Sequence, residues 1–207
     1  MNEYEYRQAE PVQENPYLTP VNLILAAINV IVFIILSVRG DTQSGMFMYE
    51  HGAMIPEAIY DPAQWYRLLT STFLHFGLSH LVNNMIMMIL LGSFVERAMG
   101  KVRYLIFYLA CGIGSSVVSS VYMLAVNDPA VSGGASGAIF GIIGALLYII
   151  LRHRGHYEGL SMRRFLIMLA LSLYFGFRSV GVDNAAHIGG LAVGFLLAVL
   201  LYRMKKA

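Results

Sequence analysis

Six apolar segments, separated by polar loops, constrain the fold of this chain more than any other feature of its sequence. They cover residues 21–38, 81–95, 104–126, 134–151, 165–177 and 185–202. A helix that crosses a membrane needs about 20 apolar residues, and about 17 can suffice. The first, third, fourth and sixth segments reach that length, and the second does so when Ser79 and His80 are included. The fifth is short, and its length alone would also fit a re-entrant or buried helix.

The composition places the chain among integral membrane proteins of the all-α class. Hydrophobic residues make up 57% of the sequence and charged residues 13%, whereas a soluble domain is closer to one quarter charged. The single cysteine, Cys111, excludes an intrachain disulfide and a cysteine-cluster metal site. No basic stripe suggests a nucleic-acid partner, and we expect no metal or cofactor.

The distribution of basic residues predicts six crossings with both termini in the cytoplasm. In that topology, eleven of the fourteen lysines and arginines lie inside, and only Arg39, Arg67 and Arg178 lie outside. Positive charge is usually enriched on the inner side. Five crossings would place the basic C-terminal tail outside, so the short fifth segment is retained as a span. We therefore expect a multi-pass protein of the cell membrane.

Residues 1–19 form a polar stretch ahead of the first apolar segment. They carry four glutamates, so we expect a cytoplasmic tail and not a cleavable signal peptide. Thr19 and Pro20 predict the start of the first helix, with threonine as its cap and proline in its first turn. Residues 20–207 are then expected to form one membrane domain.

The loop over residues 39–79 is predicted to lie on the outer side. It is rich in aromatic residues, namely Phe47, Tyr49, Tyr60, Trp65, Tyr66, Phe73 and Phe76. Aromatic rings prefer the membrane interface, so we expect this long loop to lie in the outer leaflet. It would be either a surface loop with an interfacial helix or a cover over a site beneath it.

Polar residues within the spans gather at one depth. The second, fourth and sixth spans all run inward from the outer face, and they begin near His80 with Asn84, Ser136, and His187 respectively. Ionisable groups inside a membrane are costly and usually mark function. Each residue alone has a structural explanation: a helix cap for Ser136, a hydrogen-bonded histidine for His187, and interhelical hydrogen bonds for the other two. Their agreement in depth favours a common site.

Together, these residue types suit hydrolysis by a serine nucleophile. Ser136 needs a base, and His187 can accept its proton. His80, Asn84 and the backbone N–H of Ser136 can donate to an oxyanion, and the N-terminus of the fourth span favours developing negative charge. Asp183 lies four residues before His187, and we expect it to be a solvated loop residue and not an orienting carboxylate.

Glycines line two of these spans at helical spacing: Gly137, Gly141 and Gly144 on the fourth, and Gly190 and Gly194 on the sixth. Small residues let membrane helices approach closely. Ordinary helix packing predicts the same glycines. Because both stripes begin beside Ser136 and His187, they favour close contact of the two helices there.

Four sequence elements make the chain resemble the rhomboid family of intramembrane serine proteases. They are GASG at 134–137, AHIGGLAVG at 186–194, HLVNN at 80–84 and Trp-Tyr-Arg at 65–67. They occur in the order expected of the family, and the resemblance covers nearly all of residues 20–202.

The resemblance implies a six-helix bundle with Ser136 as nucleophile and His187 as general base, acting as a dyad. It implies His80 and Asn84 as oxyanion donors. Supporting positions would be Gly134, Gly137, Phe140, Gly190, Gly194, and the loop with Trp65 and Arg67 packed in the outer leaflet. Glu96 and Arg97 are similar to a structural polar element of the family. Phe140 is a departure, because members often have tyrosine there.

The implied reaction is hydrolysis of a peptide bond in a single-pass membrane protein, near the outer face of its span and within the lipid bilayer. The fifth span is implied as a lateral gate. Two other readings remain: an inactive relative that binds membrane clients, and a small transporter with His80 and His187 in a proton relay. The first would be expected to lack Ser136 or His187. The second predicts polar residues through the full thickness of the bundle.

Overall fold

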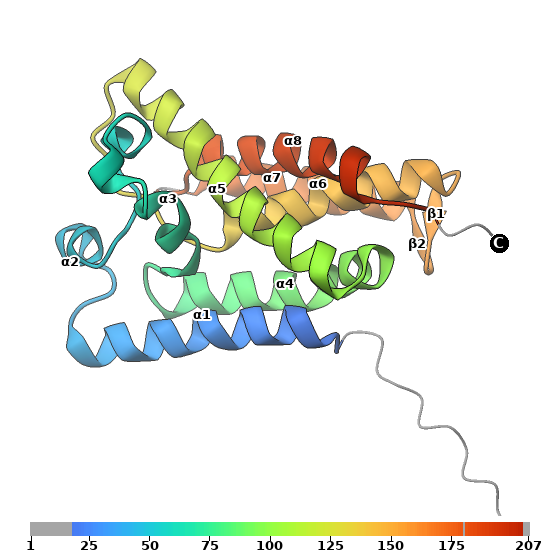
Figure 1. Cartoon of the computed structure of the whole chain (residues 1–207), viewed down its shortest axis with the longest axis horizontal. Coiled ribbons are helices and arrows are strands. Elements are labelled where there is room, and N and C mark those ends of the chain that lie inside the picture. The colour runs from blue at the N-terminus through green and yellow to red at the C-terminus, as the bar shows by residue number, and fades with distance from the viewer. Residues whose placement is uncertain (1–17, 180, 205–207) are drawn as a thin grey trace, which may run out of the picture.

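The computed structural model describes residues 18–179 and 181–204, and helices dominate it (Figure 1). The long helices are α1 (Pro20–Arg39), α4 (Leu78–Met99), α5 (Lys101–Val126), α6 (Ser136–Arg152), α7 (Met162–Arg178) and α8 (Asn184–Leu201). By length and composition, α1, α4, α5 and α8 can each cross a membrane, and α6 is a shorter apolar helix. The predicted all-α, multi-pass architecture is confirmed. Each apolar segment corresponds to one helix, whereas most of the predicted tail, residues 1–17, lies outside the described residues.

Helix α6 lies at the centre of the bundle and packs most extensively against α8. Its backbone touches that of α8, because a methyl group at Gly190 would overlap the carbonyl oxygen of Gly137. One turn further along, a methyl group at Gly194 would overlap the carbonyl oxygen of Gly141. The two glycine stripes are therefore positions of direct backbone contact, which holds the first turns of α6 and α8 together.

The first helix is capped by a side chain from another helix. Glu96, buried near the end of α4, accepts hydrogen bonds from the backbone N–H groups of Val21 (3.2 Å) and Asn22 (2.8 Å). Pro20 is in the first turn as predicted, but the hydroxyl of Thr19 makes no capping bond. The expectation that threonine caps this helix is wrong, because a carboxylate distant in sequence satisfies the exposed amides.

Buried hydrogen bonds also join α1, α4 and α5. The side-chain amide of Asn22 donates to the carbonyl of Met88 at 2.9 Å, and its oxygen accepts from the hydroxyl of Tyr104 at 2.6 Å. A methyl group at Gly92 would overlap both of these side chains. This network fixes the end of the bundle at which α1 begins.

The loop between α1 and α4 folds into short helical turns. These are α2 (Gly45–Glu50), η1 (Pro56–Ile59), η2 (Pro62–Gln64), α3 (Arg67–Thr70) and η3 (Ser71–Phe73). Arg67 is 5% exposed and donates to the carbonyls of Tyr49 (2.6 Å) and Ala53 (3.0 Å). Its guanidinium also lies over the ring of Tyr49, 4.5 Å from the centroid. Arg67 thus organises the loop from within, whereas Trp65 is 57% exposed.

Helix α7 packs more loosely than its neighbours. A short hairpin of β1 (His156–Tyr157) and β2 (Leu160–Ser161) leads into it from α6. Only Phe165 and Gly176 of the helix are buried. Its remaining apolar side chains face outward or are only partly covered, so α7 is held to the bundle by few contacts.

Candidate active site

Ser136 is the first residue of α6 and follows a segment with unusual backbone geometry. Gly134 has a φ of 151° and donates its N–H to the carbonyl of Ser71 at 2.9 Å. A methyl group at Gly134 would lie 2.9 Å from Nε2 of His80 and 3.5 Å from Oγ of Ser136. Glycine is therefore required where the chain passes between His80 and Ser136.

His187 lies in the first turn of α8 and stacks on Phe140 of α6. The ring centroids are 4.2 Å apart and the ring planes differ by 16°. Phe140 is one helical turn after Ser136, so the stack holds the imidazole close to the start of α6. Nδ1 of His187 is buried and has no hydrogen-bond partner among the described residues. It faces α7, where a methyl group at Gly176 would lie 3.4 Å away.

Asn84 and His80 come from the first turns of α4. The side chain of Asn84 is 7% exposed, and its Nδ2 is buried without a hydrogen-bond partner among the described residues. A buried donor without a partner is costly, so native proteins rarely keep one without a purpose. This amide is therefore available to a group that enters the site.

Sequence reasoning missed a second histidine beside His80. His75, in the turn before α4, is 1% exposed, and its ring centroid lies 5.2 Å from that of His80. The N–H of Ala135 donates to Nε2 of His75 at 3.5 Å. Burial, with a smaller contribution from the nearby His80, lowers the pKa of His75 to about 3. His75 is therefore neutral at physiological pH and supports the backbone just before Ser136.

Asp183 was expected to be a solvated loop residue, and the structure shows otherwise. Its Oδ2 accepts hydrogen bonds from the hydroxyls of Ser119 (2.5 Å) and Ser132 (2.6 Å), and its Oδ1 accepts from the N–H of Ala186 (2.8 Å). The carboxylate thus caps α8 and joins it to α5 and to the loop before α6. The expectation was wrong because two of its three partners, Ser119 and Ser132, are distant in sequence.

The candidate residues therefore come from the N-terminal ends of three helices, α4, α6 and α8. Comparison with known proteins adds to this. The Rhomboid domain profile matches residues 62–204, well over half of the sequence. The chain belongs to the rhomboid family.

Several named rhomboid proteins are similar to this chain. It is 36% identical over 178 residues to "Rhomboid protease GluP" of Bacillus subtilis. The aligned region covers 86% of this chain and 34% of that protein. It is 35% identical over 144 residues to "Putative rhomboid protease YdcA" of the same organism, covering 69% and 70%. "RHOMBOID-like protein 1" of Arabidopsis thaliana is 32% identical over 190 residues, covering 91% and 42%. The chain thus spans between one third and about half of the length of several relatives, including GluP.

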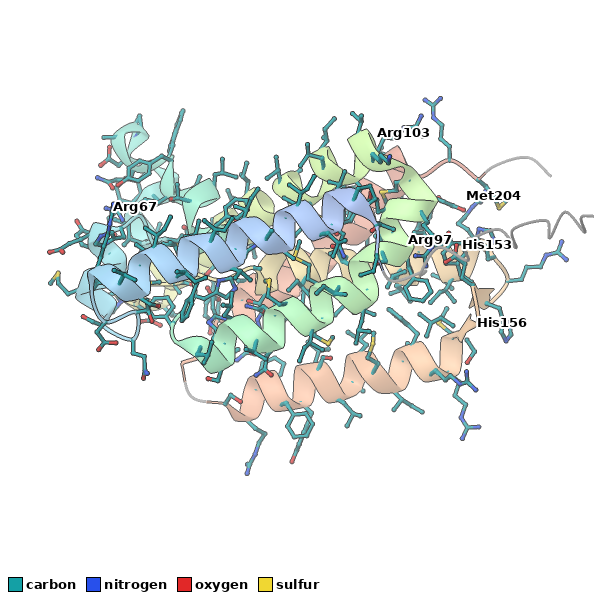
Figure 2. The ribbon with its side chains drawn as sticks, turned by 90° about the horizontal axis from the view of Figure 1, so that it is seen from below. Arg67, Arg97, Arg103, His153, His156 and Met204 are labelled. Carbon is teal, nitrogen blue, oxygen red and sulfur yellow. The ribbon has the colours of Figure 1, made fainter. Side chains whose placement is uncertain are left out.

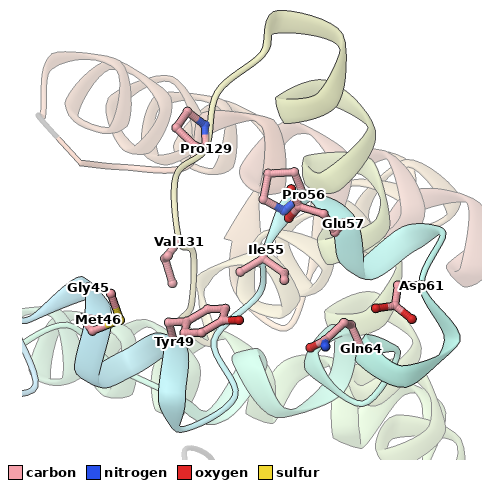
Figure 3. Close-up of a pocket in the computed structure, with 10 residues that line it drawn as sticks. All are labelled: Gly45, Met46, Tyr49, Ile55, Pro56, Glu57, Asp61, Gln64, Pro129 and Val131. Atoms are coloured by element: carbon pink, nitrogen blue, oxygen red, sulfur yellow. The ribbon is translucent and has the colours of Figure 1, made fainter.

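The α1–α4 loop and the segment before α6 of this rhomboid chain line a pocket of about 500 Å³ (Figure 3). Tyr49 and Glu57 line it from the α1–α4 loop, and Pro129 and Val131 line it from the segment before α6. Backbone hydrogen bonds of 2.8 and 2.9 Å between Met54 and Ser132 join the same two segments. The pocket is therefore adjacent to the chain that leads to Ser136, although Ser136 and His187 do not line it.

The described part of the chain offers no constellation for a metal ion. Within residues 18–179 and 181–204, no three histidine, cysteine, aspartate or glutamate side chains lie close enough together to hold one. Cys111 is buried in α5 and is in the reduced, unpaired form. The side chains at this end of the bundle supply hydroxyl, imidazole and amide groups, with the carboxylate of Asp183 at the start of α8.

Proposed function

We propose that the chain is an intramembrane serine endopeptidase in which Ser136 is the nucleophile and His187 is the general base. The observation that carries this proposal is the backbone contact of α6 with α8, which places the His187 ring on Phe140, one turn from Ser136. Membership of the rhomboid family, with relatives named as proteases, supports it.

In the proposed reaction, Nε2 of His187 accepts the proton of the Ser136 hydroxyl, since Nδ1 faces α7. Oγ of Ser136 then bonds to the substrate carbonyl carbon, and the carbonyl oxygen becomes an oxyanion. When the C–N bond breaks, the imidazolium returns the proton to the leaving amine. Water, deprotonated by the same imidazole, then attacks the acyl-enzyme ester, and the imidazolium returns the proton to Oγ of Ser136 as the ester C–O bond breaks. Phe140 orients the ring by stacking, without a hydroxyl.

The oxyanion would be stabilised by donors from α4 and α6. Nδ2 of Asn84 is buried without a partner, and the His80 ring lies across Gly134 from Ser136. The backbone N–H of Ser136 belongs to the first turn of α6, where amides lack intrahelical partners. Donors fixed in advance are worth more in a water-poor site than in bulk water.

The substrate would be a single-pass membrane protein cleaved near the outer face of its span. A scissile bond within a helix is shielded, so small or helix-breaking residues there would help it to unwind. The loose packing of α7, with only two buried residues, supports a role for that helix as the entry route from the bilayer. The protein would work in the cell membrane with both termini in the cytoplasm.

The proposal is tested by replacing Ser136 with alanine in protein reconstituted with a single-pass model substrate. We expect Ser136→Ala and His187→Ala to lower cleavage by at least about 10³-fold, with thermal unfolding in detergent little changed. Ser79→Ala is the matched control, because Ser79 is an exposed serine at the start of α4, and it should cleave as the parent does.

Labelling with a fluorophosphonate provides a second readout. The parent and Ser79→Ala should be labelled, and Ser136→Ala should not. Cleavage by Ser136→Ala at the parental rate would refute the nucleophile assignment. Absence of cleavage and labelling in the folded parent, together with retention of membrane clients, would instead indicate a binding protein, and proton-coupled solute uptake would indicate a transporter.

A further inference from the structure

A second pocket, of about 300 Å³, lies at the end of the bundle opposite to Ser136. It is formed by the end of α4, the corner at Gly100, the start of α5 and the chain after α8. Its charged residues are Arg97, Arg103 and Arg203. Figure 2 shows Arg97, Arg103 and Met204, another lining residue, at the same end of the molecule.

The arginines of this pocket are incompletely neutralised by the protein. Arg97 forms an ion pair with Glu158, with donor–acceptor distances of 2.9 and 2.6 Å. Arg103 and Arg203 are exposed and form no ion pair or hydrogen bond with the described residues. Among the residues that the structure describes, no acidic side chain lines the pocket. Two guanidinium groups therefore remain available to an anion.

An apolar surface begins directly beside these charges. On α5, Val102 is 72% exposed and Ile106 is 54% exposed. The two side chains are one turn apart and share one face of the helix. Arg103 is between them in sequence. A ligand with an anionic head and an apolar tail could contact both the arginines and the apolar side chains of α5. A small hydrophilic anion would contact only the arginines.

General enrichment of basic residues on the inner side explains why arginines occur at this end, but not why three of them share one hollow. Arg163 and Arg164, exposed at the start of α7, are at the same end and do not line the pocket. Guanidinium groups bind phosphate oxygens through paired N–H donors. Basic pockets between membrane helices are suited to anionic lipid headgroups.

We propose that this pocket binds the phosphate group of an anionic phospholipid, through Arg103 and Arg203 with Arg97 beside them, while an acyl chain lies along α5. The site is separate from the proposed protease site. Its test needs no measurement of proteolysis, so it stands or falls independently of the proposed function.

The test is lipid binding to the purified full chain in a neutral detergent, measured by native mass spectrometry. Phosphatidylglycerol and phosphatidylcholine are titrated separately. We expect phosphatidylglycerol to bind preferentially, and the R103Q/R203Q variant to bind it about 10- to 30-fold more weakly. The matched control R163Q/R164Q removes the same charge at the same end and should change binding by less than about twofold.

Two further arms decide between explanations. Glycerol 3-phosphate in millimolar excess should not displace the lipid; displacement at the same concentration as the lipid itself would overturn the lipid assignment in favour of a free phosphate compound. Equal losses in the two double variants would show general charge attraction and overturn the site. Equal affinity for phosphatidylcholine, which carries no net charge, would show binding without selection for an anionic lipid and would also overturn it. If R103Q/R203Q does not fold, R103Q is compared with R163Q under the same criteria.

Discussion

At the scale of single residues, Asp183 differs most from what its sequence position predicts. It was expected to be a solvated loop residue, and it instead forms hydrogen bonds to several segments. It connects three segments: α8 through the N–H of Ala186, α5 through Ser119, and the loop before α6 through Ser132. The N–H of His187 also donates to the carbonyl of Asp183 at 3.2 Å. Asp183 therefore positions the first turn of α8, from which the proposed base projects.

We expect Asp183→Ala to lower kcat for a model membrane substrate by about 10- to 100-fold, because a small displacement of a catalytic group is costly. KM should change little, since no substrate contact is removed. Loss of the cap should also reduce the free energy of unfolding by about 1–2 kcal/mol. The measurements are steady-state cleavage in vesicles and thermal unfolding in detergent.

Asp128→Ala is the matched control, because Asp128 accepts a hydrogen bond from the N–H of Ala130 and joins no helices. Its kcat should remain close to that of the parent. Asp183→Asn, which keeps an oxygen acceptor, should recover part of the activity. A stability loss in Asp183→Ala with parental kcat would show that the carboxylate is a cap and has no positioning role.

The position of Ser136, His187 and Asn84 near the starts of their helices could be predicted from sequence, because it depends only on where each apolar segment begins. The roles of His75 and Asp183 could not. The contact of His75 with Ala135 and the contacts of Asp183 with the two serines join residues more than fifty positions apart, and hydropathy gives no information about such pairs. The only indication of a role for His75 in the sequence was its spacing of five residues from His80.

At the scale of helices, the contact between α6 and α8 determines whether the site forms. Gly194→Ala would place a methyl group against the backbone of Gly141, and backbone cannot yield as a flexible side chain can. We expect a loss of at least about 2 kcal/mol in the free energy of unfolding and a fall in cleavage of more than about tenfold.

Gly45→Ala is the control for this substitution. Gly45 begins α2, and a methyl group there would meet no atom within 4 Å. Its stability and cleavage should match or slightly exceed those of the parent. Equal behaviour of Gly194→Ala and Gly45→Ala would show that α6 and α8 do not require backbone contact for activity.

Element positions were predictable to within a few residues because length and hydropathy define a span. The internal structure of the α1–α4 loop was not predictable. Its turns are held by Arg67, which donates to the backbone carbonyls of Tyr49 and Ala53. Because every residue has a backbone carbonyl, the sequence does not show which ones Arg67 will bind. The capping of α1 by Glu96 was missed for the same reason, since Thr19 offers a plausible local cap in sequence.

At the scale of the whole molecule, the predicted orientation can be tested with single cysteines. Cys111 is buried, so it should contribute little background. Gln43 and His156 are exposed at opposite ends of the bundle. In right-side-out vesicles, a membrane-impermeant maleimide should label Gln43→Cys directly and His156→Cys only after permeabilisation. The reverse pattern would contradict cytoplasmic termini and place the candidate active site on the inner side.

The use of Glu96 as a cap has a consequence for biosynthesis. The amide of Asn22 and the carboxylate that receives it are 74 positions apart, so the first span leaves the ribosome long before its cap exists. Until α4 arrives, those amides must be hydrated or held by lipid headgroups. When α4 docks, the Glu96 carboxylate replaces those temporary partners of the α1 amides. The hydrogen bonds to Glu96 therefore favour pairing of α1 with α4.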